Sequence, residues 1–561
     1  MTDAGTDNRA AATRTNTDTL LVRWAPVGFV AGFLLLNAGL TFDNHWPGMG
    51  VAFAPRLSLE ACLFVGLLAL WVGRYGALTA RAAFWWAAGC VLLVVLRYVN
   101  VTAPAVMGRP LHLYWDGRHA YELAKVLAGS WPWWQLAGLL LALVLGLLVL
   151  GVMARAALAA LTPALRQARS RRWVWTAVGL ALLGYAAHLP PVWDVRPHFA
   201  SPVLPTVLRQ GVLLSQALLP SRNEDVLSPS PAFDTDLSAL QTDEGPLDVV
   251  LLFAESYGAI TLDDDAHRAI LAPARERLQE ALLRNGREVV SGRVRAATFG
   301  GASWLSHASL LSGVDTSDPA HYNLLLTSQR PSLVSHFAAH GYRTVGWMPG
   351  IKRPWPEGSF YGFDRVADDA GIGYQGPDFG YWRIPDQASM AALHQQELSR
   401  TAGARPPVFA VFPTITSHAP FHPLPPLLPD THQALAPNAY TGDQLATALA
   451  APPTPGQAVV PYLRSISDQF DWLASYLDHP ATAQLLLIVV GDHQPPGMLN
   501  GQDASWDVPV HVIGAPTALL QRLRAMGFVS GLLPEEGALG SMHGLTQMLL
   551  EAFDTRSEVL K

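Results

Sequence analysis

Five long apolar stretches follow one another in the first 192 residues, and they limit the possible folds more than any other feature of the chain. They cover about residues 20–41, 56–74, 82–100, 134–154 and 173–192. A helix needs about 20 apolar residues to cross a bilayer. One such stretch also fits a buried helix of a soluble core, but five in succession favour a transmembrane domain of five helices. The composition agrees, since 50% of the 561 residues are apolar and only 15% are charged.

The arginines between these stretches predict how the domain is oriented. Two lie between the second and third stretch and five follow the fourth: Arg74, Arg81, Arg155, Arg166, Arg169, Arg171 and Arg172. Because positive charge collects on the cytoplasmic side, the N-terminus is expected inside the cell. Five spans then place everything after about residue 193 on the periplasmic or extracytoplasmic side of a bacterial inner membrane. Residues 1–19 are polar and lack the apolar core of a cleavable signal, so the first span is expected to remain as an anchor.

The remaining residues divide into a linker and one domain. Residues 193–246 are rich in Pro, Ser and Asp, which is typical of a linker, and an apolar stretch at 207–219 could form a surface helix. Residues 247–561 alternate strand-like and helix-like runs, which predicts an α/β domain with a mostly parallel central sheet. Strands are expected at 247–253, 344–348, 408–412, 485–490 and 508–513, and helices at 268–285, 332–340, 461–477 and 517–526.

Cysteine content and charge exclude two classes of protein. Both cysteines, Cys62 and Cys90, lie inside expected spans, so the outer domain cannot be a disulfide scaffold and depends on its hydrophobic core. The net charge is -6 and no basic stripe is present, so nucleic acid is not an expected partner.

Acidic and imidazole side chains directly follow two of the apolar strands. Glu255 comes after residues 249–253, and Asp492 and His493 come after residues 485–490. Ligands of an open α/β sheet bind at the carboxyl ends of its strands, so these three side chains are expected to meet there. They would hold one divalent metal, and such ligands suit manganese and zinc alike. The competing interpretations are a solvated strand end for Glu255 and a turn with a capping aspartate for Asp492.

A glycine-rich turn precedes Ser303. Ser303 begins a helix-like run that continues to residue 311, so its hydroxyl is expected at a helix N-terminus, where positive charge and free amides favour a phosphate. We predict Ser303 as the nucleophile. The alternative is a serine that only caps the helix, and Thr298 and Ser306 are weaker candidates for the nucleophile.

Three other histidines, His307, His511 and His543, are expected to be structural. Nothing in their spacing pairs them with the metal ligands. Each stays a possible site residue only because an imidazole can bind a metal or transfer a proton.

Glu255, the hydroxyl of Ser303, the Asp492-His493 pair and the five preceding spans together resemble a known family. It is the lipoteichoic acid synthase and phosphoglycerol transferase branch of the alkaline phosphatase and sulfatase superfamily. The resemblance covers nearly the whole chain in architecture, although the motifs are short. It implies that Glu255, Ser303, Asp492 and His493 bind one manganese or zinc ion, and that the hydroxyl becomes phosphorylated.

Two further stretches are similar to segments of the same family. Residues 412–421 resemble the segment in which a histidine, here His418, reaches the substrate phosphate. Residues 347–364 resemble the segment that binds the donor head group through an arginine and a tryptophan. Arg353 and Trp355 are the nearest candidates, but the arginine precedes the tryptophan, unlike the usual spacing. Many members carry threonine where this chain has Ser303, so the hydroxyl is kept without the methyl that fixes its rotamer.

The predicted function is a membrane-anchored, metal-dependent transferase. It would move a phosphoglycerol-like head group from a phospholipid donor to a glycan or lipid hydroxyl, with Ser303 as nucleophile and His418 as general acid. One alternative is a membrane-anchored phosphodiesterase, phosphatase or sulfatase-like hydrolase, in which water resolves the phosphoserine. Another is an inactive binding or sensing module. A formylglycine sulfatase is disfavoured, because Leu305 and His307 stand where that class needs proline and arginine.

Overall fold

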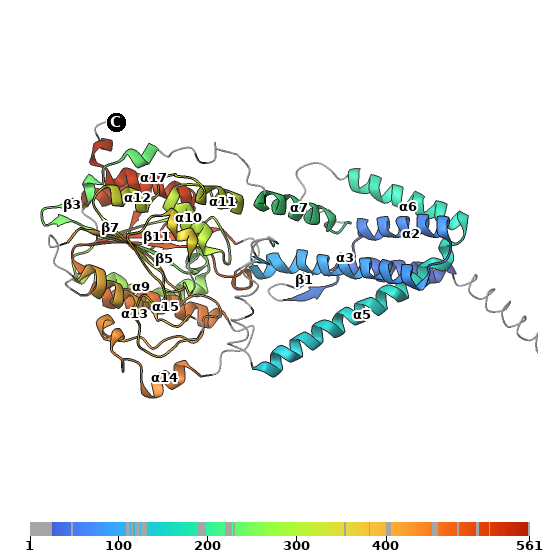
Figure 1. Cartoon of the computed structure of the whole chain (residues 1–561), viewed down its shortest axis with the longest axis horizontal. Helices are drawn as coiled ribbons and strands as arrows, with labels where there is room; N and C mark the ends of the chain where they lie inside the picture. The colour runs from blue at the N-terminus through green and yellow to red at the C-terminus, as the bar shows by residue number, and fades with distance from the viewer. Residues whose placement is uncertain are drawn as a thin grey trace, which may run out of the picture. The chain divides into compact units, whose positions relative to one another are not determined.

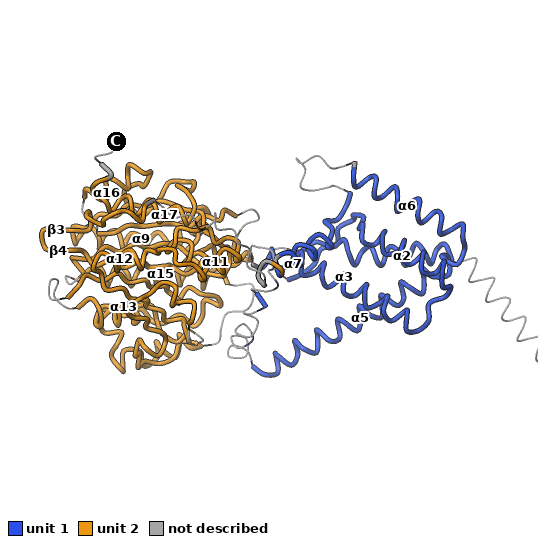
Figure 2. The backbone as a smooth tube through the Cα atoms, turned by 45° about the horizontal axis from the view of Figure 1, so that its top comes forward, with its two compact units in different colours: residues 1–106, 110–214 blue, residues 107–109, 215–561 orange. Residues whose placement is uncertain are grey.

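The computed structural model divides the chain into two compact units, which Figure 2 draws in different colours. Unit 1 comprises residues 1–106 and 110–214, and unit 2 comprises residues 107–109 and 215–561. The structure describes residues 25–45, 49–107, 132–187, 198–218, 231–352, 355–380, 382–399, 405–450, 458–479, 482–500, 504–514 and 517–558, together with positions 111, 113, 116, 117, 124 and 227.

Unit 1 is built from helices that coincide with the five apolar stretches. They are Ala25–Thr41, α2 (Leu59–Tyr75), α3 (Ala80–Met107), α5 (Trp133–Leu165) and α6 (Ala168–Ala187), with a hairpin of β1 (Asp43–His45) and β2 (Gly50–Ala52) after the first helix. Among the described residues, two helices, α3 and α5, are long and apolar enough to cross a membrane. The first helix and α2 are shorter, and α6 carries arginines in its first turns. The five-span bundle and its orientation therefore stay predictions.

The side chains of α5 differ sharply along its length. Near its end, Ala157, Leu158 and Leu161 are buried in the core of unit 1. Over its first half, Leu140, Leu143 and most of their apolar neighbours are exposed. Soluble proteins rarely expose so large an apolar surface, so this part of α5 fits contact with lipid.

The segment predicted as a linker with a possible surface helix at 207–219 contains a helix. It is α7 (Leu204–Leu218), and it exposes Leu204, Leu208 and Val212. Residues 231–246, also placed in the linker, contribute Leu237 and Leu240 to a core of unit 2, and they include β3 (Gln241–Thr242) and β4 (Gly245–Pro246). The compact part of unit 2 thus begins before residue 247.

Unit 2 is organised around an eight-stranded sheet. Its strands are β5 (Asp248–Ala254), β6 (Val289–Arg295), β7 (Arg343–Trp347), β8 (Arg365–Ala367), β9 (Val408–Pro413), β10 (Leu485–Gly491), β11 (Asp507–Ile513) and β12 (Val529–Ser530), in the order β12-β6-β11-β10-β5-β9-β7-β8. The five strands from β10 to β8 are parallel. The pairings of β11 with β10 and β6, and of β12 with β6, are antiparallel. A mostly parallel sheet was expected.

Helices cover both faces of this sheet (Figure 1). One face carries α9 (Asp265–Arg284), α13 (Asp386–Leu393) and α15 (Val459–Leu477), and the other carries α10 (Ser303–Ser312), α12 (Leu333–Ala339), α16 (Thr517–Ala525) and α17 (Met542–Phe553). Shorter helices are α8 (Ile260–Asp263), α11 (Pro319–Leu326) and α14 (Gly442–Ala448). Successive residues of β5 alternate between two cores, since Val250 and Leu252 face α9 and α15 whereas Val249 and Leu251 face the other layer. Burial on both faces explains the unbroken apolar runs of the central strands.

Candidate active site

Strand register brings the predicted acidic residues to one edge of the sheet. Ala254, the last residue of β5, pairs with Gly491, the last residue of β10. Glu255 and Asp492 therefore leave neighbouring parallel strands at the same level. Both side chains are buried, as is that of His493.

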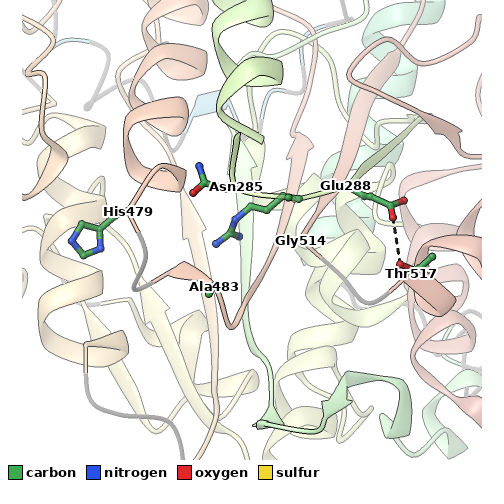
Figure 3. A pocket seen from close by; sticks show the side chains of 8 residues that line it. Asn285, Glu288, His479, Ala483, Gly514 and Thr517 are labelled. Carbon is green, nitrogen blue, oxygen red and sulfur yellow. Dashed lines mark hydrogen bonds between the residues drawn. The ribbon is translucent and has the colours of Figure 1, made fainter. Parts of the chain in front are cut away.

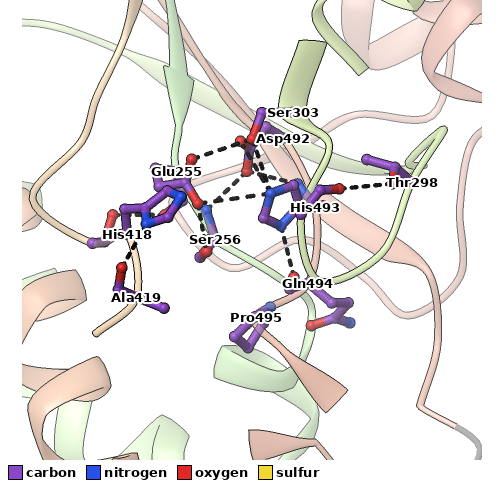
Figure 4. Close-up of polar contacts among 12 residues, drawn as sticks. Glu255, Ser256, Thr298, Ser303, His418, Ala419, Asp492, His493, Gln494 and Pro495 are labelled. Atoms are coloured by element: carbon purple, nitrogen blue, oxygen red, sulfur yellow. Dashed lines mark hydrogen bonds and ion pairs between the residues drawn. The ribbon is translucent and has the colours of Figure 1, made fainter. Parts of the chain in front are cut away.

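The three side chains converge, as Figure 4 shows. His493 Nε2 lies 3.7 Å from Glu255 Oε1 and 3.6 Å from Asp492 Oδ2. One ligand atom of each residue lies within 4.8 Å of the other two. Glu255 is far from Asp492 and His493 in the sequence, and the structure brings their side chains together, as predicted from their positions after two strands.

Hydrogen bonds orient the side chains of Asp492 and His493. Asp492 Oδ1 accepts from the backbone N–H groups of Ser256 (2.8 Å) and His493 (2.7 Å), so Oδ2 is left for a ligand. His493 Nδ1 lies 2.7 Å from the carbonyl oxygen of Gln494. A carbonyl only accepts, so Nδ1 carries the proton and Nε2 presents a lone pair.

Ser303 joins the trio from α10. Gly300 (φ 64°), Gly301 (φ 139°) and Ala302 (φ 63°) turn the chain through backbone conformations that favour glycine, and α10 begins at Ser303. Ser303 Oγ lies 3.0 Å from His493 Nε2 and 3.3 Å from Glu255 Oε2. Its hydroxyl thus faces the trio at a helix N-terminus. Thr298, a weaker candidate, donates its hydroxyl hydrogen to the carbonyl of Gly301 and holds the turn.

The charge of the site fits a cation. Burial and the nearby Glu255 carboxylate raise the pKa of Asp492 to about 6, although His493 and His307 act in the opposite direction. Two buried carboxylates, an imidazole lone pair and a hydroxyl form a donor set typical of manganese or zinc. A dication would offset the repulsion between the two carboxylates.

His418 lies beside Glu255 in the loop after β9 (Figure 4). It is half-buried, and partial burial lowers its pKa. Its Nδ1 lies 2.6 Å from the carbonyl oxygen of Ala419, so the neutral ring carries its proton on Nδ1 and presents an unprotonated Nε2. The predicted role of general acid needs a proton on Nε2. The resting imidazole instead offers a proton acceptor.

The two residues proposed for the head group differ in how far the structure describes them. Arg353 lies outside the described residues. Trp355 is half-buried against the apolar core, with its ring 5.9 Å from that of Tyr361. The tryptophan beside His418 is a different one, Trp382, whose ring centroid lies 4.6 Å from that of His418. Sequence reasoning missed Trp382, because a lone aromatic in a loop carries no periodic signal.

Asp386 holds the His418 loop in place. The N–H groups of Ile415 and Thr416 donate to its two carboxylate oxygens at 2.8 and 2.9 Å. Burial raises its pKa to about 6, against the effect of these hydrogen bonds. The carboxylate is therefore a positioning group, which the sequence analysis did not identify.

We expect Asp386 to make stability depend on pH. The folded protein holds the proton more tightly than the unfolded chain, where a carboxyl titrates near pH 3.9. Its contribution is therefore complete below about pH 4 and is lost as the pH rises through about 6. In Asp386→Asn, the loss of stability between pH 4 and pH 7 should shrink by up to about 3 kcal/mol. Thermal unfolding at both pH values measures it, and an unchanged pH dependence would contradict it.

Gly491 is required where β10 meets the turn after β5. A Cβ at this position would lie 2.0 Å from the carbonyl oxygen of Tyr257 and 3.0 Å from Val508 Cβ. We expect Gly491→Ala to cost about 3 kcal/mol or more, because the backbone beside Asp492 must move. Gly540→Ala is the matched control, since a Cβ there meets nothing within 4 Å. Thermal unfolding of both variants tests this, and equal unfolding temperatures would contradict it.

The other histidines have different surroundings. His511 is buried with both ring nitrogens engaged, by the Tyr257 hydroxyl at 3.0 Å and by the Ser291 hydroxyl at 2.6 Å. His543 Nε2 lies 3.1 Å from the hydroxyl of Ser541. His307 instead lies against the site, with Nε2 3.9 Å from Asp492 Oδ2. His307 was expected to be structural because its spacing did not pair it with the metal ligands. Its contact with Asp492 was therefore not predicted.

A separate cavity of about 210 Å³ lies at the opposite end of β10 (Figure 3). Its lining includes Arg287, Ala483 and Gly514. Ala483 precedes β10 whereas Asp492 follows it, so the length of the strand separates this cavity from the trio. The cavity is not part of the candidate active site.

Comparisons with known proteins give similarity only at the level of solved structures. No protein-family model and no curated protein matches the chain. The lipoteichoic acid synthase LtaP from Listeria monocytogenes is similar at 12% identity and a TM-score of 0.37, over 58% of this chain and 80% of that one. The phosphoglycerol transferase GacH from Streptococcus pyogenes is similar at 10% identity and a TM-score of 0.34, over 61% and 81%.

A third similar structure is a protein in the alkaline phosphatase superfamily from Vibrio parahaemolyticus, at 15% identity and a TM-score of 0.34, over 55% of this chain and 69% of that one. The sequence resemblance pointed to these same kinds of protein. At such low identity and TM-score the likeness says nothing of the reaction, for which the side chains of this chain must be considered.

Proposed function

We propose that unit 2 is a metal-dependent enzyme that transfers a phosphoryl-type group through Ser303. The observation that carries the proposal is the position of the Ser303 hydroxyl, 3.0 Å from His493 Nε2 and 3.3 Å from Glu255 Oε2 at the start of α10. A serine that only caps a helix would turn its hydroxyl to the helix amides. This hydroxyl faces two candidate metal ligands instead.

Glu255, Asp492, His493 and Ser303 are the residues that would hold one manganese or zinc ion. When bound, the ion would lower the pKa of the Ser303 hydroxyl and stabilise negative charge on the transferred group. Ser303 begins α10, and the N-terminus of a helix favours an anionic group such as a phosphate oxygen. Ser303 Oγ would form a bond to phosphorus while the bond from phosphorus to the leaving lipid alcohol breaks, which gives a phosphodiester of Ser303 that still carries the head group.

We assign His418 to proton transfer. Forming this phosphodiester moves one proton from Ser303 to the leaving alcohol, and the second step returns one from the acceptor to Ser303 Oγ. His418 begins unprotonated on Nε2, because its Nδ1 proton is bonded to the carbonyl of Ala419. It therefore starts as the proton acceptor and becomes the donor later in each step.

The proposed donor is a phospholipid with a phosphoglycerol-like head group, and the acceptor is a hydroxyl of a glycan or lipid. The apolar helices α3 and α5, with the exposed apolar half of α5, support an enzyme held at a membrane. A bacterial inner membrane with unit 2 on the periplasmic side is the proposed location. Arg353 and Trp355 remain proposed head-group residues, and Trp382 is added because its ring contacts that of His418.

Labelled lipid tests the proposal. Full-length protein in detergent is incubated with manganese or zinc, head-group-labelled phosphatidylglycerol and a glycolipid acceptor, and peptides are then mapped for a covalent adduct. We expect label on Ser303 and on the acceptor. Label on Ser303 that ends only in free head group identifies a hydrolase, and label on neither contradicts the proposal and leaves a binding module.

A further inference from the structure

We propose that His307 is a positioning residue for the metal ligand Asp492, to which its Nε2–H donates when the cation is bound. This inference rests on the proposed function, since it assigns a role to His307 in the same site. Nothing in the sequence pattern indicated it.

The position of His307 follows from α10. His307 lies four residues after Ser303, so both side chains lie on the same face of the helix. Its Nε2 lies 3.9 Å from Asp492 Oδ2. One face of its ring contacts Phe253 on β5, with ring centroids 4.2 Å apart. The imidazole is thus held between a core aromatic ring and the carboxylate.

Apolar packing against Phe253 does not explain why a polar atom, His307 Nε2, lies at this position. Nε2 is buried and has no hydrogen-bond partner among the described residues. A buried polar atom without a partner is unfavourable, and an apolar side chain would pack on Phe253 without that penalty. His511 shows the contrast, because both nitrogens of that buried ring are bonded. His307 Nε2 is therefore a buried polar atom whose hydrogen-bonding capacity is unused among the described residues.

Asp492 Oδ2 is the partner that the geometry offers. Asp492 Oδ1 already accepts two backbone N–H groups, whereas Oδ2 faces His493 Nε2 at 3.6 Å and His307 Nε2 at 3.9 Å. A carboxylate oxygen that binds a cation can also accept a hydrogen bond from its other side. A shift of less than 1 Å by either side chain brings Nε2 and Oδ2 within hydrogen-bond distance, about 3 Å.

His307 is better placed to orient a ligand than to be one. Among the described residues, the group whose ligand atoms all lie within 4.8 Å of one another consists of Glu255, Asp492 and His493, without His307. Its Nε2 lies 3.9 Å from Asp492 Oδ2 without belonging to that group. A residue in that position fixes the direction of the carboxylate, and removing such a residue typically costs 10- to 100-fold in metal affinity.

Two substitutions separate the effect of the Nε2 donor from the effect of the packing against Phe253. His307→Leu keeps an apolar contact with Phe253 and removes the donor, whereas His307→Gln restores an N–H near the position of Nε2. We expect full-length His307→Leu protein to bind Mn²⁺ 10- to 100-fold more weakly than the wild type in competition with a chelator. His307→Gln should recover most of the affinity. A residue needed only for packing would show the reverse order, because leucine preserves the apolar contact and glutamine does not.

The outcomes distinguish this inference from the proposed function. Tight Mn²⁺ binding by the wild type and equally tight binding by His307→Leu overturns the role of His307 and leaves the metal site intact. No Mn²⁺ or Zn²⁺ binding by the wild type overturns the proposed function and this inference with it. If His307→Leu does not fold, His307→Phe takes its place, since a second ring extends the contact with Phe253, and equal affinity of that variant overturns the inference in the same way.

Discussion

Ser303→Ala is expected to abolish group transfer, with a loss of at least about a thousandfold in kcat/KM. The reason is that the variant lacks the only atom that forms the covalent bond to phosphorus in the proposed reaction, and enzymes that lose a nucleophile of this kind lose most of their rate enhancement. Binding of Mn²⁺ should survive in weaker form, because Glu255, Asp492 and His493 remain. The rate of head-group transfer by the full-length variant in detergent measures the effect.

Ser303→Thr is the matched control for this prediction. Threonine keeps the hydroxyl and adds a methyl, and the resemblance implies that threonine serves at this position in many relatives. We expect the threonine variant to retain transfer activity within about tenfold of the wild type, since each tenfold corresponds to only about 1.4 kcal/mol. Full activity of Ser303→Ala would show that Ser303 is a helix residue without a chemical role.

Asp492→Asn is expected to remove metal binding and activity together. The substitution replaces a charged ligand by a neutral one, so affinity for Mn²⁺ should fall by more than 100-fold and transfer activity with it. The stability of the metal-free protein should instead stay the same or increase. Burial and the Glu255 carboxylate raise the pKa of Asp492 to about 6, so the metal-free site carries a repulsion at neutral pH that asparagine relieves.

Thermal unfolding with and without Mn²⁺ separates these effects. The wild type should be stabilised by added Mn²⁺, because the ion binds only the folded protein. Metal-free Asp492→Asn should unfold at the same temperature as the metal-free wild type or higher, and should not respond to Mn²⁺. Asp443→Asn, at an exposed position of α14, is the control that changes charge alone. Equal Mn²⁺ responses of wild type and Asp492→Asn would contradict the assignment of Asp492 as a ligand.

The central strands and the trio could be predicted because a simple rule governs them. Apolar runs at 247–253, 408–412 and 485–490 predicted β5, β9 and β10 to within a residue or two. The rule that side chains after neighbouring parallel strands meet at one edge then brought Glu255 and Asp492 together, and the pairing of Ala254 with Gly491 confirms that geometry. Sequence could not supply the register itself, which depends on the packing of both layers.

Other parts of unit 2 carry weaker signals. Strand β6 includes Ser291, Gly292 and Arg293 and was missed, because its polar residues break the apolar run although most of the strand is buried. The direction of β11 also could not be read from composition. The described residues of its connection to β10, 492–500 and 504–506, contain no crossover helix, and a parallel neighbour would need one. The strand runs antiparallel.

The side chains that surround the trio were the hardest to predict. His307, Trp382 and Asp386 act through contacts between segments far apart in the chain, namely with Asp492, His418 and the 415–416 backbone. Such contacts leave no periodic pattern and no strand-end position. Residues proposed to contact the metal or the substrate could be predicted from their positions at strand ends. Residues that orient them could not, because their positions depend on tertiary packing.

Anomalous X-ray scattering from crystals of the full-length protein soaked with Mn²⁺ examines the proposed centre directly. We expect one manganese peak about 2.0–2.3 Å from an oxygen of Glu255, an oxygen of Asp492, Nε2 of His493 and Oγ of Ser303. A peak elsewhere, or a peak at the trio with Ser303 Oγ turned away beyond about 4 Å, would show that the serine and the cation do not work together.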